Sequence, residues 1–232
     1  MCRGKLSKPM TLSQPTGKTQ ATRILLVDDH PIIRERLTEI INHEQDLMVC
    51  AEAEDRAAAL QAVSTARPNL AIIDLALKNS NGLELIKDIH ARWPRLLMLV
   101  VSMQDESLYA ERVMRAGARG YITKQEATRN ILVAIRRVLS GEIYLSDKTA
   151  STVIAHITAK PRAGGSVADR LTDRELQVFE LTGTGLSTKG IAERLCIDVK
   201  TVETYRIRIK EKLDLKDSSE LLQMAIRWSQ DR

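Results

Sequence analysis

The sequence predicts a doubly wound α/β domain with a five-stranded parallel sheet, followed by a smaller all-α domain of four helices. From residue 23 to about 140, short apolar segments with β-branched residues alternate with longer segments of helical periodicity, which is typical of βαβ units. Two of the short segments, LAII at 70–73 and LLMLVV at 96–101, are apolar throughout, as expected for strands buried on both faces of a sheet. After about residue 146 the strand pattern ceases and helix-capping patterns replace it.

The first 22 residues precede this pattern, and we expect them to be disordered because they are rich in proline, glycine and small polar residues. Residues 1–23 carry five basic side chains and no acidic one, so they account for the whole net charge of +5. The basic balance of the chain is therefore weak support for nucleic-acid binding. An inert extension, or a start codon assigned upstream of Met10, explains this segment better than a contact with DNA phosphates does.

Strands and helices alternate in the first domain, which we place at residues 23–145. The expected strands are 23–27, 47–52, 70–74, 96–101 and 119–123. The expected helices are 31–42, 55–66, 82–93, 104–116 and 126–140. Sheets of this kind bind their ligands in a crevice at the carboxyl ends of the strands, beside a topological switch point.

A linker at 146–170 joins this domain to a C-terminal domain at 171–232. The linker contains KPRAGGS at 160–166, whose proline and glycines interrupt regular structure, and a short helix can begin at 146–156. The helices of the C-terminal domain are recognised by their N-caps, and Thr172 with Glu175 reads as a capping box. They are expected after Thr172, after Ser187 at 188–195, after Asp198 at 199–213, and from Asp217 to about Trp228.

Composition excludes several classes of protein. Hydrophobic residues make up 44% of the 232 residues, which is enough for two folded cores, whereas aromatic residues at 3% argue against aromatic cages and single-strand stacking platforms. The three cysteines are far apart and form no CxxC or Cys/His cluster, which favours a reducing compartment. No apolar run approaches the roughly 20 residues of a membrane span, and no signal peptide precedes the first strand. We expect a cytoplasmic protein without a membrane partner.

Acidic, hydroxyl and basic residues fall where the predicted strands end. Asp28 and Asp29 follow the first strand, Asp74 ends the third, Ser102 follows the fourth and Lys124 follows the fifth. Three carboxylates therefore meet in one crevice, and their mutual repulsion is costly unless a cation is bound. Hard oxygen ligands with an open position are what Mg²⁺ prefers, so Mg²⁺ is the expected cofactor.

This arrangement predicts that Asp74 is a nucleophile for phosphoryl groups. The metal ion would neutralise and orient an incoming phosphoryl group, and the Asp74 carboxylate would become an acyl phosphate. Lys124 offers a cationic donor to the phosphoryl oxygens, and the hydroxyl of Ser102 offers a hydrogen bond.

Residues 23–140 resemble the receiver domain of two-component response regulators. The resemblance implies that Asp28, Asp29 and Asp74 bind the metal together with the backbone carbonyl of Ala76. It also implies that Ser102 and Tyr121 are the switch residues, and that phosphorylation draws Ser102 to the phosphate and lets Tyr121 swing inward. The surface of the fourth helix and fifth strand would then be remodelled.

The same residues allow two other interpretations. The segment that begins at Asp29 could merely cap a helix, and Tyr121 could be ordinary packing, but the joint order of acids, hydroxyl and lysine favours the receiver chemistry. Phosphatases of the haloacid dehalogenase type also use a nucleophilic aspartate at a strand end. They need a second aspartate two residues later, where this chain has Ala76. We therefore expect no turnover enzyme.

Residues 171–228 resemble the LuxR-type helix-turn-helix domain, through LTDRE at 171–175, GLSTKGIA at 185–192 and TVETY at 201–205. The whole chain is similar to response regulators of the NarL/FixJ family. The helix at 199–213 would then enter the major groove, with Val202, Ile209 and Leu213 on its core side.

The resemblance implies that Glu203, Thr204 and Ile207 face bases, whereas the other contacts position the domain on the phosphates. The full set of candidate DNA contacts is Lys200, Thr201, Glu203, Thr204, Tyr205, Arg206, Ile207, Arg208 and Lys212. The alternative is a solvent-exposed helix face stabilised by ion pairs, such as Glu203 with Arg206 or Arg208 with Glu211. These pairs leave several lysines without a partner.

The expected partners follow from both resemblances. A sensor histidine kinase would phosphorylate Asp74, and a dimer paired through the last helix would bind double-stranded promoter DNA. In the family the unphosphorylated receiver often masks the recognition helix. A ligand-gated LuxR-type regulator is the alternative, but the aromatic-poor α/β domain offers no aromatic-lined small-molecule pocket.

Overall fold

The computed structural model describes residues 21–77, 80–147, 149–151 and 167–230. The tail predicted at 1–22 and the linker predicted at 146–170 therefore lie largely outside the described residues. Among the described residues, no helix combines the length and the apolar character that crossing a membrane requires.

The N-terminal domain is a five-stranded parallel sheet in the order β2-β1-β3-β4-β5, which confirms the predicted doubly wound fold. The strands are β1 (Thr22–Val27), β2 (Leu47–Ala53), β3 (Leu70–Ile73), β4 (Leu97–Ser102) and β5 (Gly120–Thr123). The helices are α1 (Pro31–Asn42), α2 (Arg56–Ala66), α3 (Gly82–Arg92), α4 (Glu106–Ala116) and α5 (Lys124–Leu139). The switch in strand order lies between β1 and β3, where a ligand crevice is expected.

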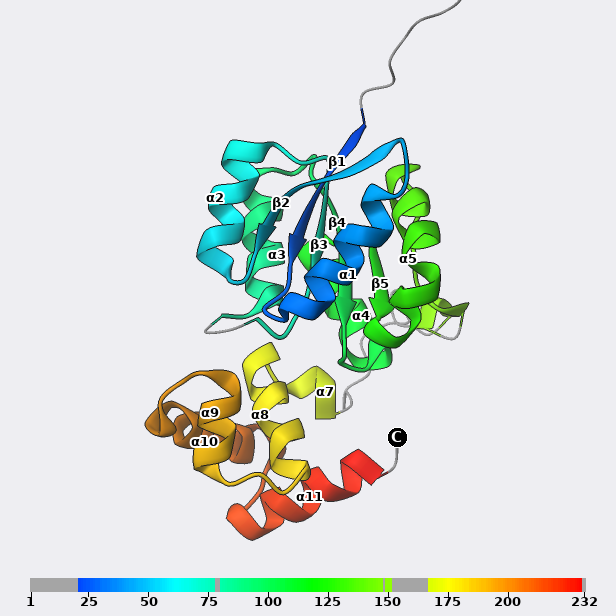
Figure 1. Cartoon of the computed structure of the whole chain (residues 1–232). Helices are drawn as coiled ribbons and strands as arrows, with labels where there is room; N and C mark the ends of the chain where they lie inside the picture. The colour runs from blue at the N-terminus through cyan, green and yellow to red at the C-terminus, as the bar shows by residue number, and fades with distance from the viewer. Residues whose placement is uncertain (1–20, 78–79, 148, 152–166, 231–232) are drawn as a thin grey trace, which may run out of the picture.

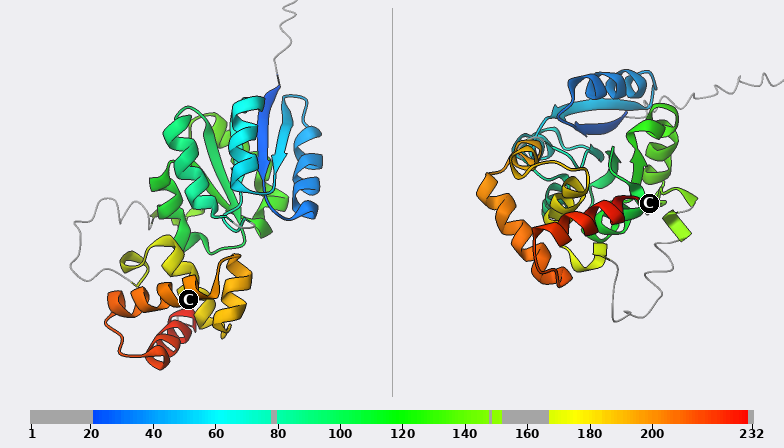
Figure 2. Two further views of the ribbon diagram at one scale, coloured as in Figure 1. Left: turned by 90° about the vertical axis from the view of Figure 1, so that its left-hand side faces the viewer. Right: turned by 90° about the horizontal axis from the view of Figure 1, so that it is seen from below.

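Successive residues of each central strand point to opposite faces of the sheet, and both faces are buried. Leu25, Ala71 and Val100 face the layer formed by α2, α3 and α4. Ile24 and Leu99 face the layer formed by α1 and α5. The two layers of helices can be followed in Figures 1 and 2. The continuous apolar character of these strands is explained by burial from both sides.

The starts of α4 and α5 each differ by two residues from the sequence-based boundaries. Helix α4 begins at Glu106, because the side chain of Asp105 accepts a hydrogen bond from the Ser107 amide. Helix α5 begins at Lys124, directly after β5, because Thr123 caps it by accepting a bond from the Glu126 amide. Lys124 is therefore fixed by a helix and a strand together.

The C-terminal domain is built from α7 (Val167–Arg170), α8 (Asp173–Gly183), α9 (Thr188–Leu195), α10 (Val199–Leu213) and α11 (Ser218–Gln230). The predicted capping box of α8 is present, with Thr172 and Glu175 as its partners. Ser187 caps α9 as predicted, whereas Asp198 precedes α10 without a side-chain capping bond.

Helices α8 and α11 approach each other closely in the core of this domain. A Cβ at Gly183 would lie 2.5 Å from the Ala225 carbonyl oxygen, so glycine permits the contact. Near this crossing, the rings of Phe179 and Trp228 pack edge to face with centroids 5.4 Å apart. The C-terminal domain lies beyond the end of the sheet at which the strands terminate (Figures 1 and 2).

Candidate functional site

The acidic residues at the strand ends converge as the sequence predicts. Asp28 follows β1 and Asp74 follows β3, the two strands at the switch point, and both residues are buried. Asp28, Asp29, His30 and Asp74 each offer one ligand atom, and these atoms lie within 4.8 Å of one another. Such a cluster of oxygen donors fits a hard divalent cation, and His30 adds an imidazole nitrogen that the sequence reading did not include.

Lys124 neutralises part of this negative charge. Its Nζ lies 2.7 Å from Oδ2 of Asp74 and 2.6 Å from Oδ2 of Asp28. Burial opposes the charged form of Lys124, but the carboxylates of Asp74 and Asp28 raise its pKa above the ordinary value. Burial also raises the pKa of Asp74, against the attraction of Lys124. The lysine therefore stays charged and holds the two carboxylates together.

The other oxygen of Asp74 is bound by neutral donors. The hydroxyl of Ser102 donates to Oδ1 over 2.8 Å, and the backbone amide of Ala76 donates to the same atom over 3.2 Å. Asp74 is 2% exposed. Its carboxylate is thus oriented from the end of β4, from the start of α5 and from its own loop.

Tyr121 is fully buried, and its hydroxyl donates to the carbonyl oxygen of Gln104 over 2.9 Å. Burial raises the pKa of Tyr121 far above its ordinary value, so the phenol stays neutral. The inward position that the resemblance associates with phosphorylation is thus the position that Tyr121 takes in this structure. The bond to Gln104 ties the ring to the loop that leads into α4.

Two positioning residues were missed by the sequence reading. Arg34 on α1 donates from Nη1 to the Asp28 carbonyl oxygen over 2.5 Å, and from Nε to Glu52 on β2 over 3.2 Å. Gly82 begins α3 directly against the backbone of Asp74, where a Cβ would lie 2.1 Å from the Asp74 carbonyl oxygen. Neither contact has a sequence motif of its own, because each depends on how a helix packs against the end of a strand.

The segment after α5 is attached to the same region. The Tyr121 amide donates to the Tyr144 carbonyl oxygen over 2.8 Å, so this segment pairs with β5. Glu106, buried at the start of α4, accepts from the Ser146 amide over 2.8 Å and from the Thr149 hydroxyl over 3.0 Å. The first residues of the predicted linker are therefore bound to the elements that carry Tyr121 and Gln104.

Helix α10 has the predicted division between core and surface. Val202, Ile209 and Leu213 are buried against the C-terminal domain, and Ile207 is 53% exposed on the other side. The other exposed members of the candidate DNA-contact set are Lys200, Glu203, Thr204 and Arg208.

The other candidate DNA contacts are less exposed, and two of them bind partners within the domain. Thr201, Tyr205, Arg206 and Lys212 are all half-buried. Arg206 donates to the Thr188 hydroxyl over 2.9 Å, rather than pairing with Glu203. Lys212 donates to the buried carboxylate of Glu175 over 2.6 Å.

Two family models match the chain. Residues 24–136 match the response regulator receiver domain, and residues 169–225 match the bacterial regulatory proteins of the luxR family. The oxygen regulatory protein NreC of Staphylococcus haemolyticus is 35% identical over 210 residues, which cover 88% of this chain and 97% of that protein. NreC of Staphylococcus aureus strain MRSA252 is 34% identical with the same coverage.

Solved structures give the same result for the fold. A LuxR-family two-component response regulator from Aurantimonas sp. SI85-9A1 is 30% identical, with a TM-score of 0.55 over 60% of this chain and 100% of that one. The RcsB protein of Salmonella enterica serovar Typhimurium, solved on promoter DNA with the phosphomimetic BeF3−, is 23% identical. Its TM-score is 0.62 over 89% of this chain and 98% of that one.

Proposed function

Because the chain belongs to the NarL/FixJ-type response regulators, which join a receiver domain to a LuxR-type DNA-binding domain, we propose that phosphorylation of Asp74 switches its activity. The protein is a two-component transcriptional regulator. We place the receiver domain at 23–145 and the DNA-binding domain at 171–232, with a linker at 146–170 and a disordered tail at 1–22.

The observation that carries the proposal is the environment of Asp74. Its carboxylate lies between the ammonium of Lys124 and the hydroxyl of Ser102, in a crevice that also contains Asp28. Asp28, Asp29 and Asp74, with the carbonyl of Ala76, would hold Mg²⁺. The ion, when bound, offsets the negative charge of a phosphoryl group among these carboxylates.

In the reaction, a carboxylate oxygen of Asp74 attacks the phosphorus of a phosphohistidine on a sensor kinase. The phosphorus–nitrogen bond breaks, a phosphorus–oxygen bond forms, and the imidazole leaves with the electron pair and takes a proton from water. Lys124 and Ser102 then donate to the oxygens of the transferred group. The protein acts as an acceptor rather than a turnover enzyme, because Ala76 stands where a haloacid dehalogenase has its acid.

DNA recognition falls to α10. Glu203, Thr204 and Ile207 lie on its exposed face, where Glu203 can accept from a cytosine amino group and the other two can contact thymine methyl groups. Lys200 and Arg208 are exposed cations that can contact phosphates, and Tyr205, Arg206 and Lys212 would first exchange contacts within the domain. We expect a phosphorylated homodimer on two half-sites of promoter DNA in the cytoplasm.

Phosphoryl transfer from acetyl phosphate with Mg²⁺, followed by intact-mass measurement, tests the receiver chemistry. One added phosphoryl group that requires Mg²⁺ and is absent in Asp74→Asn supports the proposal. A phosphoryl gain that persists in Asp74→Asn would place the acceptor elsewhere. Asp88→Asn, which removes a carboxylate of α3 that pairs with Arg56, is a matched control and should keep the wild-type gain.

A further inference from the structure

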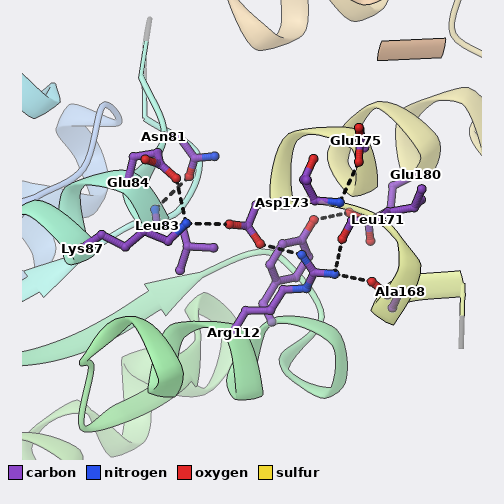
Figure 3. A network of polar contacts seen from close by, with 12 residues as sticks. Asn81, Leu83, Glu84, Lys87, Arg112, Ala168, Leu171, Asp173, Glu175 and Glu180 are labelled. Atoms are coloured by element: carbon purple, nitrogen blue, oxygen red, sulfur yellow. Dashed lines mark hydrogen bonds and ion pairs between the residues drawn. The ribbon is translucent and has the colours of Figure 1, made fainter. Parts of the chain in front are cut away.

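Helix α4 of the receiver domain contacts the joint between α7 and α8 of the DNA-binding domain (Figure 3). Nη1 of Arg112 lies 2.5 Å from Oδ1 of Asp173, the first residue of α8. Nη2 of the same guanidinium donates to the carbonyl oxygens of Ala168, in α7, and Leu171, just after it. Arg112 therefore satisfies carbonyl groups at the end of one helix and an acid at the start of the next.

Two further contacts surround this one. Lys87 on α3 lies 3.1 Å from the second carboxylate oxygen of Asp173. The hydroxyl of Tyr109, one turn before Arg112 on α4, donates to Oε2 of Glu180 over 2.5 Å. Arg112 and Asp173 are only 18% and 19% exposed, and Tyr109 is 1% exposed, so the contact excludes most water.

Tyr109 also connects this contact to the switch residue. Tyr109 and Tyr121 are both fully buried and belong to the same hydrophobic cluster. Burial and the neighbouring Glu180 carboxylate raise the pKa of Tyr109 well above its ordinary value, so its phenol stays protonated and donates to Glu180. Tyr121 in turn is bound to Gln104 in the loop that leads into α4, the helix that carries Tyr109 and Arg112.

The contact does not cover the face of α10 that reads DNA. Glu203, Thr204, Ile207 and Arg208 are all exposed with both domains in place. This differs from the masked recognition helix that the family resemblance implies. What the contact fixes is the joint of α7 and α8, and through it the orientation of the whole DNA-binding domain.

We infer that α4 is a docking surface for the chain's own DNA-binding domain, held by Arg112–Asp173 and Tyr109–Glu180, and that it restrains the domain's orientation without masking α10. The inference rests on the proposed function for its link to Asp74. Release of the contact frees the domain to pair with a second copy on adjacent half-sites. The affinity of one domain for one half-site stays the same, because its reading face is already accessible.

The test uses the full chain with Tyr109→Phe and Arg112→Ala combined. Tyr109→Phe removes one hydroxyl and keeps the ring that fills the core, so the domain remains packed. Arg115→Ala is the matched control, because Arg115 lies one turn away, is 70% exposed and pairs with Glu111 on its own helix. Equal melting temperatures and equal Mg²⁺-dependent phosphoryl gain in all three proteins establish that folding and Asp74 chemistry are intact.

Small-angle scattering measures whether the domains separate. The double variant should have a larger maximum dimension than the wild type and the control, because charge-assisted bonds of this kind shift such an equilibrium by about tenfold. An unchanged scattering profile would overturn the inference, since the contact would then not hold the domains together. This result does not depend on phosphorylation, so it is separate from the test of Asp74.

DNA-binding measurements distinguish restraint of the domain's orientation from masking of the reading face of α10. The probes are a duplex recovered by selection from random sequence with the wild-type protein, and a shortened duplex that keeps one half-site. The double variant should bind the paired site roughly tenfold more tightly and the single half-site within about twofold of the wild type. An equal gain on both duplexes would contradict the inference, because it would mean that the receiver domain covers the reading face.

Discussion

Nζ of Lys124 lies 2.7 Å from Oδ2 of Asp74, and the bond joins the start of α5 to the end of β3. The same ammonium lies 2.6 Å from Asp28, so a single cation bridges two buried carboxylates. A buried charge without its partner is strongly destabilising. Lys124 therefore has a structural role in addition to the phosphoryl binding that we propose for it.

Lys124→Ala should lower the free energy of unfolding by about 3 kcal/mol in the absence of divalent cations, because two buried carboxylates then repel each other. Added Mg²⁺ should restore part of this loss, since it replaces the missing positive charge. Chemical unfolding with and without Mg²⁺ measures both effects. Lys189→Ala, an exposed lysine of α9, is the control; a loss no larger than the control's would count against the bridging role.

Arg34→Ala should weaken Mg²⁺ binding by about 10- to 100-fold, as removal of a group that orients ligands typically does. Arg34 holds the Asp28 carbonyl oxygen and bridges to Glu52, so it fixes the loop that carries the acidic pair. Calorimetric titration with MgCl₂ gives the affinity. Arg36→Ala removes an exposed arginine two residues along α1 and should leave the affinity unchanged; equal affinities in all three proteins would exclude a positioning role for Arg34.

Glu175→Gln should change the acid stability of the DNA-binding domain. Burial works against the ionised form, but bonds from Lys212 and Thr172 hold the pKa of Glu175 below its ordinary value. The native state then binds fewer protons than the unfolded state, so this stabilisation is present above the ordinary glutamate pKa of about 4.3 and is lost as pH falls through the native value.

The variant should lower the free energy of unfolding by about 1–2 kcal/mol at pH 7 and flatten its decline below pH 5. Urea unfolding followed between pH 7 and pH 3 measures both changes. Glu211→Gln, on the exposed side of α10, should keep the wild-type pH dependence. If the free energy of unfolding of Glu175→Gln falls with pH as steeply as that of the wild type, the acid sensitivity belongs to other carboxylates.

Lys200→Ala should weaken binding to every DNA sequence by a similar factor and make the negative slope of log affinity against log salt concentration shallower by about 1. Lys200 is exposed at the start of α10, where a phosphate contact would position the helix without reading bases. Binding titrations at several salt concentrations measure the slope. The control is Arg95→Ala, which removes an exposed cation of the receiver domain and should leave the slope unchanged. An altered base preference in Lys200→Ala would instead indicate that Lys200 contacts a base.

The parts of the fold that could be predicted from sequence are those with a local cause. The strand at 70–73 is apolar throughout because both of its faces are buried, and the capping box at Thr172 and Glu175 lies within one helical turn. The crevice was predictable for a similar reason. Once the strands are parallel, Asp28, Asp74 and Lys124 must lie at the same edge of the sheet.

Contacts that depend on how separate elements pack together could not be predicted in this way. Arg34 reaches the Asp28 carbonyl oxygen through the packing of α1, and Glu106 is bound by Ser146 and Thr149, about 40 residues away. Lys212 was expected to be available for a phosphate contact, but it is half-buried and bound to Glu175, which lies on another helix. Docking of α4 on the α7–α8 joint is a further relationship that periodicity and motifs do not contain.

The central claim is that phosphorylation of Asp74 controls DNA binding, and binding to the selected paired-site duplex tests it most directly. Wild type and Asp74→Asn are each titrated before and after treatment with acetyl phosphate and Mg²⁺. Treatment should increase the affinity of the wild type for this duplex and leave the affinity of Asp74→Asn unchanged. An equal change in both proteins, or no change in a wild type that has gained its phosphoryl group, would contradict this claim.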